Sequence, residues 1–273
     1  LKEYNQPVSV EKPPGYDASL FYCATESEKC KDAEKMNRIL WPKDKMINYG
    51  ALPNKKYMIN WPINGNDYYA NGIELTHSER EVLYEKAKLK SKQFLYYLQT
   101  DLGFTHLGIS KEFPTKDGFP FMPYHRESRR IHGLTTLTIN HLADPYSQKK
   151  PLYRTGIAVG DYPVDHHHDA HPNANELPEL HFYPVPSYSV PLGCLIPETV
   201  DHLLVTEKSI SVSNIVNGTT RLQPVVIQLG QAAGITAALA HLQKVTPREV
   251  PVREVQKNLL SQGGYLLPYL DVP

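Results

Sequence analysis

The stretch that decides the fold is residues 202–242, HLLVTEKSISVSNIVNGTTRLQPVVIQLGQAAGITAALAHL. Its first part predicts a strand over 202–206 that continues over 209–213, because short apolar runs with β-branched residues favour strands. A loop containing Gly218 follows at 214–220. The long apolar run at 221–242 predicts a helix. Strand, glycine loop and long helix organise the rest of the chain.

The predicted helix carries apolar residues on nearly every face, which is typical of a buried helix. Thr220 and Gln223 have the spacing of a capping box, and Pro224 falls in or next to the first turn, where its missing N–H costs little. Gly230 and Gly234 lie on one line of the helix. A glycine inside a helix costs about 1 kcal/mol relative to alanine. This line therefore predicts a flat neighbour, such as a strand or a cofactor.

The glycine loop before this helix has two interpretations. A glycine loop that opens a helix gathers free N–H groups at the positive end of the helix dipole, which suits a phosphate or an electron-rich ring. Arg221 adds a positive charge there. Alternatively, the loop is a tight turn over a packed core, because a single glycine loop is a weak signal. The residues alone leave both interpretations open.

A series of motifs along residues 58–242 carries a family resemblance. In order they are NWPINGND (60–67), FLYYLQTDLG (94–103), PYHRESRRI (123–131), AVGDYP (158–163), LGCLIP (192–197), NGTTRLQP (217–224) and LGQAAG (229–234). Together they resemble the C-terminal portion of the FAD-dependent oxidoreductase family labelled xanthan-lyase-like, which is one of the glutathione-reductase-type flavoproteins. The resemblance implies FAD as the cofactor. It also implies hydride transfer to the flavin from a polar small-molecule substrate, with a carbohydrate derivative as one option.

The resemblance also implies a division of the chain and a partner. The fingerprint G-x-G-x-x-G that holds a dinucleotide pyrophosphate does not occur in these 273 residues. We therefore expect an α+β fold, with a mixed-sheet substrate domain over 1–190 and the closing strand and buried helix of a flavin domain over 191–273. The expected partner is a dinucleotide-binding portion preceding this sequence, without which the chain is expected to be inactive and could lack FAD.

The resemblance assigns cofactor-binding roles near the glycine loop. It places Asn217, Gly218, Thr219 and Arg221 at the isoalloxazine side of FAD, with Gln231 nearby on the helix.

Three residues depart from the family pattern. Glu207 stands where the family has glycine, and a carboxylate there disfavours a phosphate. Asn214 and Asn217 stand where histidines are usual, and asparagine cannot act as a proton-transfer base. These departures predict weak flavin binding or loss of the redox step. They keep open a second class, a non-catalytic carbohydrate- or partner-binding module on the same scaffold, which the tyrosine-rich loops would suit.

Two polar segments supply candidate catalytic residues. Arg126, Arg129 and Arg130, around Glu127, either bind an oxygen-rich substrate through forked donors or form an internal Arg–Glu network that braces a strand predicted at 134–140. Arg126 and Arg129 are the candidate catalytic residues of this segment. The second segment, DHHHDAH at 165–171, is a metal site, a substrate-pocket loop or an exposed polar loop. Because consecutive histidines point in different directions, we expect no metal. Its His167 is the candidate acid or base.

Composition narrows the function classes. Lys plus Arg equals Asp plus Glu, 29 each, so net charge attracts neither nucleic acid nor an anionic membrane. Polar residues and small residues interrupt the 221–242 helix, so we do not expect a membrane span. Cys23 and Cys30 either pair or stay free thiols.

The remaining predicted elements are local. An amphipathic helix is predicted over 77–102, with a capping box of Thr76 and Glu79 and an end at Gly103. Patterning also predicts a surface helix at 26–39, a short helix at 252–260, and strands at 155–162, 179–183 and 187–190.

Overall fold

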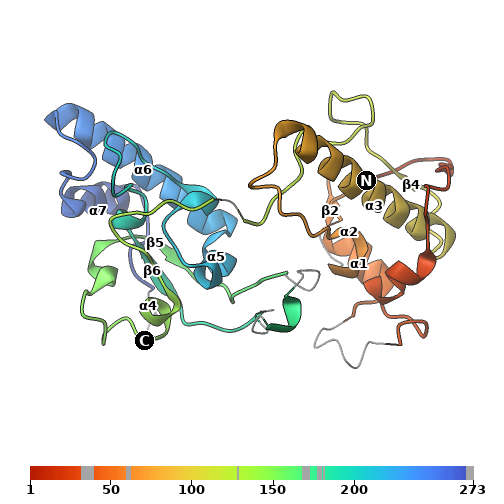
Figure 1. Cartoon of the computed structure of the whole chain (residues 1–273), viewed down its shortest axis with the longest axis horizontal. Coiled ribbons are helices and arrows are strands. Elements are labelled where there is room, and N and C mark those ends of the chain that lie inside the picture. The colour runs from red at the N-terminus through yellow and green to blue at the C-terminus, as the bar shows by residue number, and fades with distance from the viewer. Residues whose placement is uncertain are drawn as a thin grey trace. The chain divides into compact units, whose positions relative to one another are not determined.

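The computed structural model describes residues 1–31, 40–59, 63–127, 129–167, 173–176, 180 and 182–268. The chain forms two compact units, unit 1 at Leu1–Tyr124 and unit 2 at His125–Pro273 (Figure 1). Both combine helices with small sheets, so the predicted α+β class is confirmed. Within the described residues, neighbouring strands pair antiparallel, and parallel pairing occurs at the isolated bridge between Leu137 and Val212. The functional division predicted at 190/191 falls inside a strand of unit 2 and stays a prediction.

Unit 1 packs helices against a short four-stranded sheet in the order β2-β3-β1-β4. Its elements are β1 (Lys2–Glu3), a 3-10 helix (Ala18–Ala24), α1 (Lys43–Tyr49), β2 (Ala51–Leu52), β3 (Lys56–Tyr57), α2 (Ile63–Asn66), α3 (His77–Thr100) and β4 (Leu107–Gly108). Phe21, Met46, Phe94 and Leu98 are fully buried at its centre. One apolar stripe of α3 therefore supplies much of this core.

The helix α3 confirms the prediction over 77–102. The Thr76 N–H donates to Glu79 Oε2 at 2.8 Å, and the Glu79 N–H donates to Thr76 Oγ1 at 3.4 Å, which is the predicted capping box. The chain leaves the helix through Gly103, whose φ of +82° suits glycine. Hydrogen bonds between residues three apart fix this start, so a local pattern was sufficient to find it.

Cys23 and Cys30, which the sequence left open, form a disulfide with a Cα–Cα distance of 4.9 Å. Residues 26–31 between and beyond them are turns and bends, so the helix predicted at 26–39 is wrong over that part. The rest of that prediction, 32–39, lies outside the described residues.

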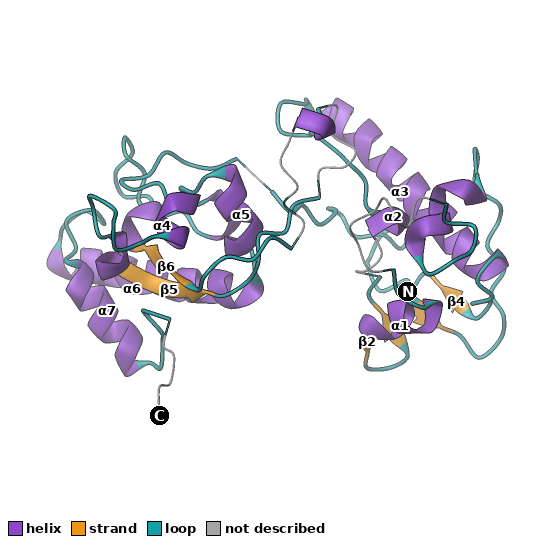
Figure 2. Ribbon diagram, turned by 90° about the horizontal axis from the view of Figure 1, so that it is seen from below, coloured by secondary structure: helices purple, strands orange, loops and turns teal. Residues whose placement is uncertain are grey.

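Unit 2 builds its core between a two-stranded sheet and two helices. Its elements are α4 (Ile139–Ala143), β5 (Gly156–Gly160), β6 (Tyr188–Pro191), α5 (Asn214–Thr220), α6 (Gln223–Gln243) and α7 (Val252–Ser261), with 3-10 turns at Leu152–Thr155, Ala174–Glu176, Leu192–Cys194 and Glu207–Ser209. Figure 2 shows α6 and α7 beside β5 and β6. Leu195, Ile210, Leu229 and Leu259 are fully buried between them.

Several local predictions for unit 2 are confirmed. The strands β5 and β6 fall at the predicted 155–162 and 187–190, and α7 falls at the predicted 252–260. The strand predicted at 179–183 lies partly outside the described residues, and its end forms an isolated bridge between Val164 and Tyr183.

The strand predicted over 202–206 and 209–213 is wrong. His202 and Glu207 have φ angles of +55° and +63°, in the left-handed region that breaks an extended run. Residues 202–206 are irregular, and Glu207–Ser209 form a 3-10 turn. A nearby prediction fails similarly, because 134–140 holds an isolated bridge at Leu137 and then the start of α4.

The predicted glycine loop at 214–220 is the helix α5. Ser213 caps it by accepting from the Val216 N–H, and the Asn217 N–H donates to the Ser213 carbonyl at 2.9 Å. Thr220 ends α5 and donates its hydroxyl to the Val216 carbonyl at 3.2 Å. The capping box predicted for Thr220 and Gln223 is therefore wrong, and α6 begins after Leu222 without a side-chain cap.

The helix α6 is buried on one face rather than all round. Val225, Leu229 and Thr236 face the core, whereas Gly230 and Gly234 are exposed, and nothing lies within 4 Å of a Cβ built on either glycine. Among the described residues, α6 is also the helix that is long and apolar enough to cross a membrane. That is weak evidence, because helices of globular cores pass the same test.

Replacing Glu207 with glycine is expected to raise the free energy of unfolding by about 1 kcal/mol. The left-handed conformation costs a residue with a Cβ about 1–2 kcal/mol, and glycine's greater freedom in the unfolded chain returns part of it. Urea unfolding monitored by circular dichroism measures the difference. Glu207→Ala is the matched control, since it removes the carboxylate but keeps the Cβ. Equal stabilisation by both variants would refute backbone strain as the cause.

Candidate functional site

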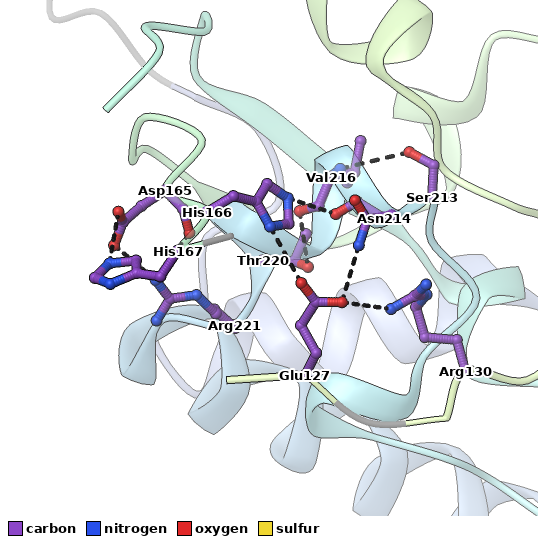
Figure 3. Close-up of polar contacts among 10 residues, drawn as sticks. All are labelled: Glu127, Arg130, Asp165, His166, His167, Ser213, Asn214, Val216, Thr220 and Arg221. Carbon is purple, nitrogen blue, oxygen red and sulfur yellow. Dashed lines mark hydrogen bonds and ion pairs between the residues drawn. The ribbon is translucent and has the colours of Figure 1, made fainter. Parts of the chain in front are cut away.

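The candidate site is a polar cluster in unit 2, where Glu127 and Arg130 meet residues 164–167 and α5 (Figure 3). At its centre lies His166, whose side chain is 5% exposed. Its Nδ1 is 3.1 Å from Glu127 Oε1, and its Nε2 is 2.8 Å from the Asn214 carbonyl oxygen. A carbonyl oxygen only accepts hydrogen bonds, so Nε2 donates to Asn214, and Nδ1 faces the carboxylate of Glu127. His166 therefore links Glu127 to the start of α5.

Glu127 is anchored by three groups. Besides His166, it accepts from Asn214 Nδ2 at 2.9 Å and from Arg130 at 3.4 Å. Burial acts to raise the pKa of Glu127, but the hydrogen bonds and charges of His166 and Arg130 outweigh it and leave that pKa below its usual value. Glu127 is thus an ionised carboxylate at neutral pH.

Replacing Glu127 with glutamine is expected to lower stability at pH 7 by about 1 kcal/mol, a modest value because 37% of the side chain is exposed to screening solvent. Because folding lowers the pKa of Glu127, its stabilisation is present above the unfolded pKa of about 4.3 and is lost as pH falls through the folded value. Urea unfolding at a series of pH values checks this. A wild-type advantage that stays constant below pH 4 would contradict the assignment.

A second group lies beside the first, around Asp165. Arg221 donates to Asp165 Oδ2 at 2.7 Å and to its backbone carbonyl at 3.1 Å. His167 Nε2 lies 3.1 Å from the other carboxylate oxygen, Oδ1. The side chains of Asp165, Arg221 and His167 are 8%, 9% and 12% exposed. Since Asp165 accepts from Nε2, the basic nitrogen of a neutral His167 ring is Nδ1.

The helix α5 packs closely against Val164 and His166. A Cβ on Gly218 would lie 2.9 Å from His166 Nε2 and 3.0 Å from Val164 Cγ1. Thr219 donates its hydroxyl to the Tyr162 carbonyl at 2.6 Å, so the Tyr188 hydroxyl, 2.8 Å away, must donate to Thr219. Burial is the main cause that raises the pKa of the Tyr188 hydroxyl, so this hydroxyl stays protonated. The space beside Gly218 and the hydroxyl of Thr219 are thus already used by contacts within unit 2.

Asn217 is the exception among the predicted cofactor residues. It is fully buried, and its Oδ1 and Nδ2 have no hydrogen-bond partner among the described residues. An unpaired buried amide costs about 1–3 kcal/mol, so it indicates a missing group that both donates and accepts. A flavin ring has carbonyl and imide groups of this kind. The uncapped first turn of α6 offers further N–H groups. At these two points the residues fit a flavin.

Of the other predicted residues, Arg126 and Arg129 lie on the same segment as Glu127, and Gln231 lies further along the chain. Gln231, on α6, donates to Gln262 at 2.9 Å. Arg126 is half-buried and Arg129 is exposed. Arg130, the third arginine of this segment, pairs with Glu127, so the Arg–Glu contact of the second alternative is present, although the strand that it was to brace does not form.

The histidine segment is described only in part. His168, Asp169 and His171 lie outside the described residues. Within the part that the structure describes, no group of three potential ligands could hold a metal ion.

The sequence grouped Glu127 with its neighbouring arginines but did not predict its contacts with His166 and Asn214. Glu127 and Asn214 are 87 residues apart, and His166 and Asn214 are 48 apart. The one usable signal was the i, i+3 spacing of Glu127 and Arg130, which is common in ordinary surface pairs.

Comparison with known proteins gives one result. No curated protein and no solved structure gave a significant match. A family model described as FAD dependent oxidoreductase matches residues 2–259, which is most of the chain. Members of this family use FAD for redox chemistry. The chain belongs to the FAD-dependent oxidoreductase family.

Proposed function

We propose that this protein contributes to the oxidation of a polar small molecule. The flavin, when it is bound, would accept the hydride from this substrate. The proposal rests on the family match over residues 2–259 together with the unpaired buried amide of Asn217. Within the family, the motifs favour the xanthan-lyase-like branch of the glutathione-reductase-type flavoproteins. A carbohydrate derivative is the substrate class that we would screen first.

His167 is the proton acceptor in this proposal. Asp165 accepts from its Nε2 and so directs the lone pair of Nδ1 away from the carboxylate. Arg221 keeps Asp165 ionised by pairing with it at 2.7 Å. Arg126 and Arg129 would hold oxygen atoms of the substrate through their forked donors.

In the same proposal, Asn217 and the first turn of α6 hold the flavin. Gly218, Thr219 and Arg221 fix α5, directly before α6, through the contacts described above. Gln231 lies about two turns further along α6. The exposed small-residue face of α6, with Gly230 and Gly234, would pack against a dinucleotide-binding portion of the same protein.

A flavin titration tests the proposal. FAD is added to this chain and to a form extended upstream, and binding is followed by flavin absorbance and by the melting temperature. We expect binding by the extended form. Failure of both forms to bind FAD would refute the proposal.

Asn217→Leu sharpens the test because it acts in opposite directions on two readouts. Replacing an unpaired buried amide with an apolar side chain of similar size should raise the stability of the flavin-free protein by about 1–2 kcal/mol. The same change should weaken FAD binding by the extended form. Gln243→Leu, at the far end of α6 where Gln243 donates to Glu254, is the control and should leave FAD binding within about twofold. Equal FAD affinity of wild type and Asn217→Leu would remove Asn217 from the flavin site.

A further inference from the structure

Unit 1 contains a cavity of about 250 Å³ that belongs to neither polar group described above. It lies between α1, the end of β1 and residues 103–107. Ile47 and Leu107, each 4% exposed, form an apolar floor, and the Phe104 ring stands beside them. The Lys43 ammonium lies 5.6 Å from the Phe104 ring centre and donates to the Leu102 carbonyl. The cavity therefore has one apolar side with a fixed aromatic ring.

Other residues that line the cavity are polar. Asp44 and Asn48 are four residues apart on α1, so they project from one face of that helix into the same space. Glu3 joins them from β1 and accepts from the Tyr57 hydroxyl at 3.1 Å. His106 Nδ1 lies 3.0 Å from the Tyr4 carbonyl and must donate to it, which leaves Nε2 as an acceptor in the neutral ring.

The charge of this lining disfavours acidic ligands. Two carboxylates, of Glu3 and Asp44, line the cavity, and the residues that line it include neither lysine nor arginine. Lys55 lies 3.8 Å from Glu3, but its side chain is 60% exposed. A phosphate or carboxylate would meet like charge with no partner in the cavity. A ligand that mainly donates hydrogen bonds suits it.

We propose that this cavity binds a neutral hydroxylated ring of monosaccharide size. Ring hydroxyls donate to the Glu3 and Asp44 carboxylates, and the Asn48 amide can both donate and accept. The apolar C–H face of such a ring fits the floor beside Phe104. The volume lies just below the roughly 300–1,000 Å³ of typical ligand pockets, so one ring fills it. This site is independent of the flavin assignment.

The test measures binding of D-glucose, D-galactose, D-mannose and D-xylose to the full chain by saturation-transfer NMR and calorimetry. We expect at least one sugar to bind with Kd in the millimolar range, about −4 kcal/mol. D-glucuronate should bind at least tenfold more weakly, because of its charge. Absence of binding by all four sugars would overturn the proposal, as would equal or tighter binding of glucuronate or of the amine putrescine.

Three variants locate the binding. Asp44→Ala should weaken it about tenfold, and Asn48→Trp should abolish it by filling the cavity from an exposed helix position. Glu11→Ala removes an exposed carboxylate that does not line the cavity and should change nothing. Circular dichroism confirms that each variant is folded. Sugar binding that survives Asn48→Trp would place the site elsewhere and refute the assignment.

Discussion

Replacing Gly160 with alanine is expected to destabilise unit 2 by about 3 kcal/mol or more. Gly160 ends β5 and pairs directly with Tyr188 on β6. A Cβ built on Gly160 would overlap the Tyr188 ring. That ring is 4% exposed, and its hydroxyl is bonded to Thr219, so it cannot move without breaking a buried contact. Overpacking of this kind typically costs 1–3 kcal/mol, and a tethered ring places Gly160 at the upper end.

Chemical unfolding of Gly160→Ala measures this effect, with Gly234→Ala as the control. Gly234 lies inside α6 with nothing within 4 Å of its Cβ, so alanine there should stabilise by about 1 kcal/mol. Combining Gly160→Ala with Tyr188→Ala should cost less than the sum of the two single changes, because the overlap has been removed. Strict additivity, or a Gly160→Ala protein as stable as wild type, would show that the overlap is not the cause.

Replacing Arg221 with alanine is expected to cost about 3 kcal/mol. The Arg221–Asp165 pair is almost fully buried, at 9% and 8% side-chain exposure, with a distance of 2.7 Å. Removing one partner of a buried pair leaves the other charge without compensation. Here Asp165 would still contact His167 at 3.1 Å, which limits the loss. Arg221→Lys keeps the charge but loses the planar fork, so it should recover only part of the stability.

A double-mutant cycle separates the ion pair from simple loss of packing. Arg221→Ala combined with Asp165→Asn should cost clearly less than the sum of the two single changes, with a coupling of about 1–3 kcal/mol. Glu85→Ala is the comparison for an exposed pair, since Glu85 is 63% exposed where it meets Lys88. It should cost less than about 0.5 kcal/mol. Coupling near zero in the Arg221–Asp165 cycle would show that the pair contributes nothing specific.

Arg221 and Gly160 differ in how far the sequence alone pointed to their roles. Arg221 was predicted from the resemblance as a cofactor residue, and the structure adds a structural role by pairing it with Asp165. Gly160 appeared only as a member of the AVGDYP motif. Its importance depends on Tyr188, 28 positions later, and no local pattern connects the two residues.

Glu207 shows how a family resemblance and the backbone inform each other. The resemblance implies glycine at this position, and the structure gives Glu207 a left-handed φ of +63°. The glycine preference therefore has a backbone reason that is separate from approach to a cofactor. The left-handed backbone at Glu207 also explains why the strand predicted at this point does not form.

The sequence by itself determined the α+β class, the family, and the elements whose signals are local. The capped start of α3, the strand β5 and the helix α7 depend on residues a few positions apart, so their patterns survive without knowledge of the fold. Tertiary structure alone decided that 214–220 is helical, that α6 is buried on one face, and that His166 lies between Glu127 and Asn214. These features depend on contacts between segments tens of residues apart, whose packing and hydrogen bonding override local preference.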